Sequence, residues 1–217
     1  MKHFVILQIL ILVLFSACNT SEDYFAQFNQ KPEITVKGIL DNDFYRKEID
    51  SIKINHEYHL YYKINNEENE KLKAYVTCDN IFTYKIDNEK ITILSKKKET
   101  GKFKIYTKDS FGATDELTIK ITCFVNLQPV PILEIEDIPG FKFEKKLNAS
   151  QSYDTDNEYG GGISLYRFFV NGKEFEKTYH TYMDYTFPSS GQYEIGLQVK
   201  DTDGQWSDRV NKTLIID

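Results

Sequence analysis

The segment Gly191-Gln-Tyr193-Glu-Ile195-Gly-Leu197-Gln-Val199-Lys-Asp201-Thr-Asp-Gly204 alternates apolar and polar residues between a leading glycine and an Asp-x-x-Gly turn. Alternation with a period of two is typical of a β-strand that buries one face. A second alternating stretch, residues 210–216, follows the turn, so the two stretches predict an antiparallel hairpin. The residues expected to face the core are Tyr193, Ile195, Leu197 and Val199, opposite Gln192, Glu194, Gln198 and Lys200.

An earlier copy of this motif reads Gly101-Lys-Phe103-Lys-Ile105-Tyr-Thr107-Lys-Asp109-Ser-Phe-Gly112 and is two residues shorter. It also continues into an alternating stretch, residues 117–123. Two such hairpins predict an all-β chain with two sandwich domains in tandem. The 15 Tyr and 15 Phe agree with this, because aromatic residues favour pleated, half-buried strands. Further strands are expected at residues 33–37, 57–64, 71–78, 81–86 and 90–94.

The second copy lies in a segment that resembles the PKD domains, which are immunoglobulin-like modules of extracellular and surface proteins. The matching features are Pro129-Val-Pro131, Leu147-Asn-Ala149-Ser150-Gln-Ser152-Tyr-Asp154-Thr-Asp156, Tyr166-Arg-Phe168 and the segment 191–204. The chain departs from the family at Phe168-Phe169-Val170-Asn171-Gly172-Lys173, where PKD domains usually have Trp-Asp-Phe-Gly-Asp-Gly. Asn171-Gly172 is nevertheless a strong signal for a two-residue hairpin turn. The first copy looks like a more diverged immunoglobulin or cadherin-like domain.

These features predict a fixed domain order. We expect a signal peptide at residues 1–17, a polar tether at 18–30, an immunoglobulin- or cadherin-like β-sandwich at 31–125, a linker at 126–131 and a PKD-like β-sandwich at 132–217. The chain after residue 17 is long enough for two domains of about 90 to 100 residues. The prolines of the linker favour an extended connection.

The N-terminus indicates export and lipid attachment. Lys2 precedes an apolar run, residues 4–15, that is too short for a membrane span and fits a signal peptide. The run ends in Leu14-Phe15-Ser16-Ala17-Cys18, which resembles the bacterial lipobox although Phe15 replaces the usual aliphatic residue. The resemblance implies that Cys18 carries the lipid. The alternatives are an uncleaved anchor or an ordinary secretory signal with a coincidental cysteine, and both still export the chain.

Composition limits the partners. Without residues 1–17 the chain loses Lys2 and no acid, so 26 basic side chains face 33 acidic ones. No basic stripe with interleaved aromatics is present, which argues against a nucleic acid partner. Together with the lipid signal, this predicts a cell-envelope protein, anchored to the outer membrane and facing the periplasm or the exterior.

Two cysteines remain after Cys18, and export permits a disulfide between them. Cys78 continues the inward parity of the predicted strand 71–78, and Cys123 continues that of residues 117–121. Both thiols are therefore expected to face the same core. A bridge between them and a pair of buried free thiols both agree with this parity, because parity does not fix the distance between the Cα atoms.

Two acidic loops of the second domain are expected at the same end of the sandwich, because the loops that join strands B to C and F to G meet there. Their oxygen-rich sequences, residues 154–160 and 201–204, suit Ca²⁺. The candidate ligands are Asp154, Asp156, Asp201 and Asp203. The alternative is that these residues form turns and solvate the loops.

The same end carries Tyr153, Tyr159 and Trp206, the only tryptophan. Aromatic residues on sandwich loops are suited to contact a sugar ring or a protein partner, and they also serve to cover a core. Both interpretations remain open from the sequence.

No catalytic motif is found. The histidines lack the spacing of a zinc site, and nucleophile elbows, phosphate loops and dinucleotide fingerprints are missing from the sequence. We therefore expect a binding or spacer protein, not an enzyme, that presents its domains to a glycan or protein partner. The alternative is a structural subunit of an envelope assembly or secretion complex, which would pack through exposed strand edges.

Overall fold

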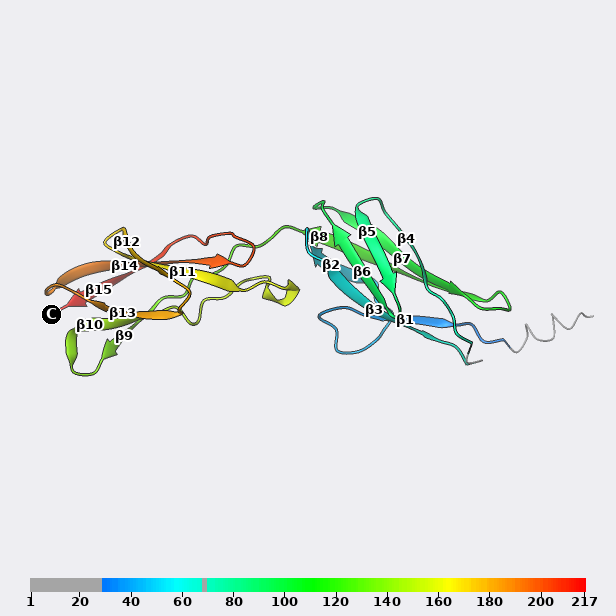
Figure 1. The fold of residues 1–217 in the computed structure, drawn as a ribbon, viewed down its shortest axis with the longest axis horizontal. Coiled ribbons are helices and arrows are strands. Elements are labelled where there is room, and N and C mark those ends of the chain that lie inside the picture. Colours follow the sequence, from blue (N-terminus) through cyan, green and yellow to red (C-terminus); the bar gives the residue numbers. More distant parts are fainter. Residues whose placement is uncertain (1–28, 68–69) are drawn as a thin grey trace, which may run out of the picture. The chain divides into compact units, whose positions relative to one another are not determined.

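The computed structural model describes residues 29–67 and 70–217, and strands make up nearly all of its regular structure (Figure 1). The chain divides into two compact units. The first ends at Cys123, and the second contains Phe124–Asp217 together with Ile52–Ile54. In the described part of the chain, no helix is both long and apolar enough to cross a membrane. The predicted signal peptide and Cys18 lie outside the described residues.

The first unit consists of two four-stranded sheets. One has the order β1-β3-β6-β5 and the other the order β2-β8-β7-β4. The buried residues between them are aliphatic and aromatic, and Ile34, Ile91, Ile93, Phe103, Ile105 and Ile119 are fully buried. The strands are β1 (Glu33–Lys37), β2 (Ile49–Lys53), β3 (Tyr58–Asn65), β4 (Tyr75–Cys78), β5 (Phe82–Asp87), β6 (Lys90–Ser95), β7 (Thr100–Lys108) and β8 (Thr114–Phe124).

The second unit pairs a three-stranded sheet, β13-β10-β9, with a four-stranded sheet, β12-β11-β14-β15. Its core is one cluster that includes Leu133, Leu147, Phe168, Phe187, Ile195 and Leu197. The strands are β9 (Glu134–Ile138), β10 (Phe141–Asn148), β11 (Ile163–Val170), β12 (Lys173–Thr178), β13 (Tyr182–Thr186), β14 (Gly191–Asp201) and β15 (Val210–Ile216), and a short 3₁₀ helix spans Asn157–Tyr159.

The two predicted hairpins are confirmed as β7–β8 and β14–β15. Burial alternates along both strands of the first hairpin, and in the second the side chains of Tyr193, Ile195, Leu197 and Val199 are buried as expected. Asn171 and Gly172 form the turn between β11 and β12, both with positive φ (48° and 79°), as a type I′ turn requires. The all-β class with tandem immunoglobulin-like sandwiches is therefore confirmed.

One strand is shorter than predicted. The apolar alternation predicted a strand over residues 71–78, but β4 forms only at Tyr75–Cys78. Its partner β7 ends at Lys108, two residues beyond the Tyr75–Tyr106 pair, because Asp109 begins a turn. Residues 71–74 therefore have little partner strand to pair with.

The two cysteines do not form a disulfide. Cys78 lies on β4 opposite Phe103 of β7, and Phe103 lies opposite Ile119 of β8. Cys123 is thus two strands across and four residues along the sheet from Cys78, which is well over 10 Å at about 4.8 Å per strand and 3.3 Å per residue. A bridge needs Cα atoms within about 7 Å. Of the two alternatives from the sequence, the structure has the free thiols, and burial raises the pKa of both.

The core of the second unit predicts that alanine substitutions at two phenylalanines change the free energy of unfolding by very different amounts. Phe168 is fully buried, whereas Phe141 is 57% exposed. Phe168→Ala should lower the free energy of unfolding by about 3–5 kcal/mol because it leaves a cavity. Phe141→Ala should change it by less than about 0.5 kcal/mol. Urea unfolding followed by the fluorescence of Trp206 measures both, and equal effects of the two variants would contradict the assigned core.

Candidate functional site

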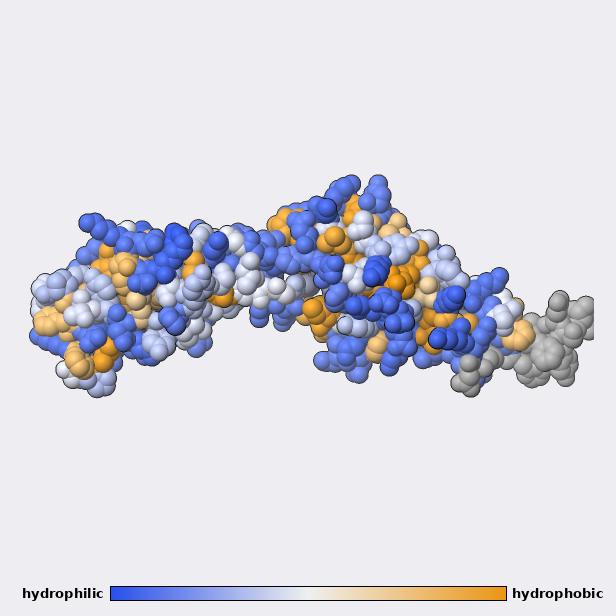
Figure 2. Space-filling model, viewed as in Figure 1, coloured by the Kyte–Doolittle hydropathy of each residue, from blue (hydrophilic) through white to orange (hydrophobic). Residues whose placement is uncertain are grey.

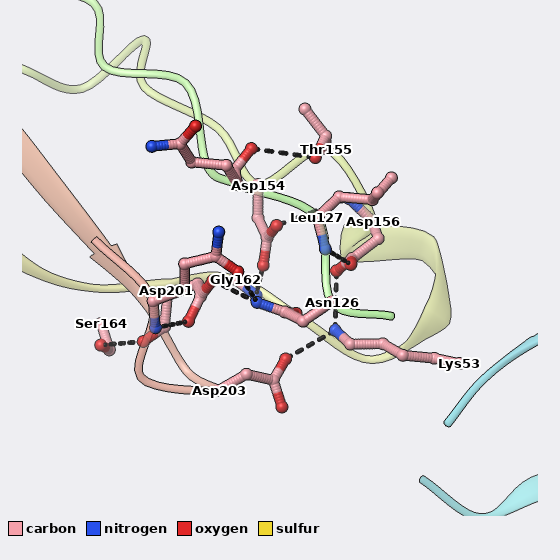
Figure 3. Close-up of polar contacts among 12 residues, drawn as sticks. Lys53, Asn126, Leu127, Asp154, Thr155, Asp156, Gly162, Ser164, Asp201 and Asp203 are labelled. Atoms are coloured by element: carbon pink, nitrogen blue, oxygen red, sulfur yellow. Dashed lines mark hydrogen bonds and ion pairs between the residues drawn. The ribbon is translucent and has the colours of Figure 1, made fainter. Parts of the chain in front are cut away.

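The two acidic loops of the second unit lie together around the ammonium group of Lys53 (Figure 3). Lys53 is at the end of β2, in the segment that belongs to this unit, and its side chain is only 1% exposed. Its Nζ lies 2.7 Å from Asp156 Oδ1 and 2.6 Å from Asp203 Oδ2. A buried ammonium therefore joins the first loop to the second. We call Asp154, Asp156, Asp201 and Asp203 the acidic pole.

Asp154 is held by the backbone of its own loop. Its Oδ2 accepts a hydrogen bond of 2.8 Å from Gly162 N. Gly161 packs so closely that a Cβ there would come within 2.4 Å of Asp154 Oδ2, so this position needs glycine. Burial and the neighbouring charge of Asp156 raise the pKa of Asp154 above its usual value. The folded unit therefore holds a proton on Asp154 more readily than the unfolded chain does.

The connecting segment before the second sandwich supplies further donors. Leu127 N donates to Asp156 Oδ2 at 2.7 Å, and Asn126 Nδ2 donates to Asp201 Oδ2 at 2.7 Å (Figure 3). The other oxygen of Asp201 accepts from Gln205 N at 2.8 Å. Each carboxylate of the acidic pole is thus engaged by protein groups, as buried charges require.

The charge on Lys53 follows from these contacts. Burial acts to lower the pKa of its ammonium, but hydrogen bonds to Asp156 and Asp203 outweigh burial and hold the pKa above the ordinary lysine value. A raised lysine pKa means that the stabilisation is fully present below the pKa of the unfolded chain and is lost only as pH rises through the raised value. The ion pairs therefore persist at neutral pH.

The first unit contains a second buried lysine with the same arrangement. Lys47 is 6% exposed, and its Nζ lies 2.7 Å from Asp41 Oδ2 and 3.2 Å from Asp50 Oδ2. Tyr58 Oη donates to Asp50 Oδ2 at 2.6 Å. Each unit therefore pairs one buried ammonium with two aspartates. The same arrangement in both units indicates that these aspartates stabilise a buried lysine charge.

The contacts of Lys53 bear on the predicted calcium site, because they involve two of its four candidate ligands. The sequence predicted that the four aspartates come together, and the structure brings Asp156 and Asp203 to one ammonium. Across residues 29–67 and 70–217, no group of three or more His, Cys, Asp or Glu side chains is arranged to hold a metal ion. The structure does not test calcium binding at these aspartates, and the Lys53 ammonium, which the sequence did not reveal, would compete with Ca²⁺ for Asp156 and Asp203.

The three loop aromatics have different neighbours. Tyr159 packs edge-on against Phe124 with ring centroids 4.8 Å apart, and Tyr153 is 51% exposed. The Trp206 ring lies under the guanidinium of Arg167, with 4.1 Å between the guanidinium carbon and the ring centroid. Since Arg167 alternates with the buried Tyr166 and Phe168 along β11, Trp206 lies on the outer face of that sheet.

One of the histidines, His59, contacts a neighbouring strand. His59 Nδ1 lies 3.3 Å from Thr92 Oγ1 across β3 and β6, which is a cross-strand contact. The carboxylates of Asp156 and Asp203 in the acidic pole bind the ammonium of Lys53.

Sequence reasoning missed the groups that hold the aspartates, namely the side chains of Lys53 and Asn126 and the backbone N–H groups of Leu127, Gly162 and Gln205. Lys53 is 103 residues from Asp156 along the chain, and lysine is seldom fully buried. Leu127 contributes a backbone N–H, which leaves no trace in the sequence. The only available signal was the order of the loops, and it located the aspartates alone.

No known protein family model matches the chain, and no curated protein is similar to it. Similar solved structures include fibronectin(III)-like modules of CbhA from Clostridium thermocellum, with 14% identity, coverage of 84% of this chain and 94% of that chain, and a TM-score of 0.36. The PKD1 domain of the metalloprotease PrtV from Vibrio cholerae has 23% identity, covers 42% of this chain and 99% of that chain, and has a TM-score of 0.33.

A third similar structure is SGBP-B of the Bacteroides ovatus mixed-linkage glucan utilization locus, in complex with a mixed-linkage heptasaccharide. It has 15% identity, covers 84% of this chain and 47% of that chain, and has a TM-score of 0.34. Fibronectin III, PKD and immunoglobulin domains are thus among the solved structures similar to this chain, each with a TM-score below 0.5.

The buried ion pairs predict that Lys53 is essential to the second unit. Lys53→Met keeps the apolar part of the side chain but leaves two carboxylates without their cation, and should lower the free energy of unfolding by about 3–5 kcal/mol. Urea unfolding followed by Trp206 fluorescence measures the loss. Lys212→Met, at an exposed position of β15, is the matched control and should cost less than about 0.5 kcal/mol. An unchanged urea midpoint for Lys53→Met would show that the ion pairs do not support the fold.

Proposed function

We propose that the chain is a lipid-anchored cell-envelope protein that presents its two β-sandwich units to a glycan or protein partner. The supporting observation is that Lys53 and amide and backbone donors bind the carboxylates of the acidic pole, whereas large aromatic side chains remain exposed on both units. Hydrophobic residues form separate patches among hydrophilic ones (Figure 2). Exposed tyrosines include Tyr61, Tyr75, Tyr84 and Tyr106 of the first unit and Tyr153, Tyr179 and Tyr182 of the second.

Two features separate this proposal from an enzyme. A catalytic group must be able to reach a substrate, but Asp154, Asp156 and Asp201 are at most 5% exposed and are held by internal donors. Exposed tyrosines suit recognition, because each offers a large apolar face and a hydroxyl at little cost in side-chain entropy. Contact with a partner is therefore assigned to the surfaces of the sandwiches.

The anchor can be tested separately from the partner. In bacteria that express the full chain, radiolabelled fatty acid should be incorporated into the protein, and the protein should sediment with the membranes. Cys18→Ala should abolish both, because its thiol would carry the lipid. Cys78→Ala is the control, since Cys78 lies on β4 and should not affect labelling. Label retained in Cys18→Ala would refute the lipid anchor.

A further inference from the structure

The outer face of the β4–β7–β8 sheet in the first unit carries an ordered set of side chains. The strand register places Tyr75, Tyr106 and Glu116 in one row across the three strands, and Thr77, Lys104 and Thr118 in the next. Buried residues alternate with these positions along each strand, so the row residues point away from the core. Their side chains are therefore not needed to fill the sandwich.

Tyr75 and Tyr106 form a stacked pair on this face. Their ring centroids are 5.4 Å apart with an interplanar angle of 24°, and the residues are 48% and 36% exposed. Stacking holds each ring against the other and reduces its freedom. The pair therefore offers solvent a rigid apolar surface, which is suited to pack against the C–H groups of a flat ligand such as a sugar ring.

Two shallow hollows lie beside the tyrosines. One, of about 400 Å³, is lined by Thr77, Cys78, Asp79, Lys102, Lys104 and Thr118. The other, of about 330 Å³, is lined by Thr77, Lys104, Tyr106, Thr114, Asp115 and Glu116. Both share Thr77 and Lys104, so they adjoin across the strands. The short side chains of threonines line these hollows beside longer lysine and tyrosine side chains. Threonine hydroxyls both donate and accept hydrogen bonds.

Three lysines on this face, Lys102, Lys104 and Lys120, outnumber its two acids, Asp79 and Glu116, although the chain as a whole has a net charge of −6. The Asp79 carboxylate accepts a hydrogen bond of 2.7 Å from Lys102 N. Lys104 pairs with Glu116 at 3.0 Å. Lys102 and Lys120, in contrast, lie directly opposite each other on β7 and β8, and neither makes an ion pair with another described residue. Like charges directly opposite each other destabilise a sheet. A ligand with negative charge would relieve this repulsion.

We propose that this face binds an anionic polysaccharide, a chain of sugars that carry carboxylate or sulfate groups. The Tyr75–Tyr106 pair stacks on a sugar ring, Lys102 and Lys120 bind an anionic group, and the hydroxyl of Thr77 bonds to sugar hydroxyls. The adjoining hollows suit an extended ligand. The inference rests on the proposed binding function and names its ligand class.

The test compares dextran sulfate with dextran, which have the same sugar backbone. Residues 19–217 should be retarded by dextran sulfate in affinity electrophoresis and not by dextran, and the retardation should weaken with salt. Tyr75→Ala and the double variant Lys102→Thr/Lys120→Thr should each weaken binding about tenfold or more. The matched controls in the second unit are Tyr179→Ala, at an 81% exposed tyrosine, and Lys212→Thr, and they should bind like the unsubstituted chain. Thermal melting checks that each variant is folded.

The outcomes separate this inference from the proposed function. Equal retardation by dextran, no retardation by dextran sulfate, or an equal loss in the control variants would overturn the polysaccharide site. Lipid labelling at Cys18 would still support the envelope protein in each of these cases, with a neutral glycan as the partner if dextran binds equally and a protein partner if neither polysaccharide binds. Loss of the label with intact polysaccharide binding would instead refute the anchor alone.

Discussion

A buried charge needs a partner of opposite sign, and this requirement organises the loop end of the second unit. Lys53 satisfies Asp156 and Asp203 together, while backbone and amide donors satisfy Asp154 and Asp201. Removing one member leaves the others charged in a site that is nearly closed to water, so the groups stabilise the structure as a set. In many sandwiches these loops contact ligands. In this chain their aspartates Asp156 and Asp203 bind Lys53, which joins the two loops.

The strands that could be predicted are those whose own sequence shows, by alternation, which face is buried. Along β7, β8 and β14 the inward positions are mostly apolar, with Thr107, Asp115 and Asp201 as the buried polar exceptions near the turns, and each turn has its glycine or aspartate, so the hairpins followed directly from the sequence. The end of β4 could not be predicted, since it depends on where β7 stops. β2 was missed because Ile49–Lys53 lacks regular alternation and buries a lysine at its end.

The site was predictable to the same limited degree. Loop order brought the aspartates together, because sandwich topology places those loops at one end. It could not reveal Lys53, which comes from a distant segment, nor the outer position of Trp206, which depends on contact with Arg167. The cysteines show the same limit, since Cys123 is buried and Cys78 is half-buried, and parity did not fix the distance between them. Because protein groups already hold the carboxylates of the acidic pole, we propose the exposed sheet face of the first unit as the binding surface.

The most direct test of this account is the melting temperature of residues 19–217 in millimolar Ca²⁺ and in excess chelator. Because the Lys53 ammonium already lies between Asp156 and Asp203, we expect the same melting temperature in both conditions. A ligand that binds only the folded chain must raise the melting temperature. A clear rise with Ca²⁺ that is lost in Asp201→Asn would contradict the account and show that the acidic pole is a metal site.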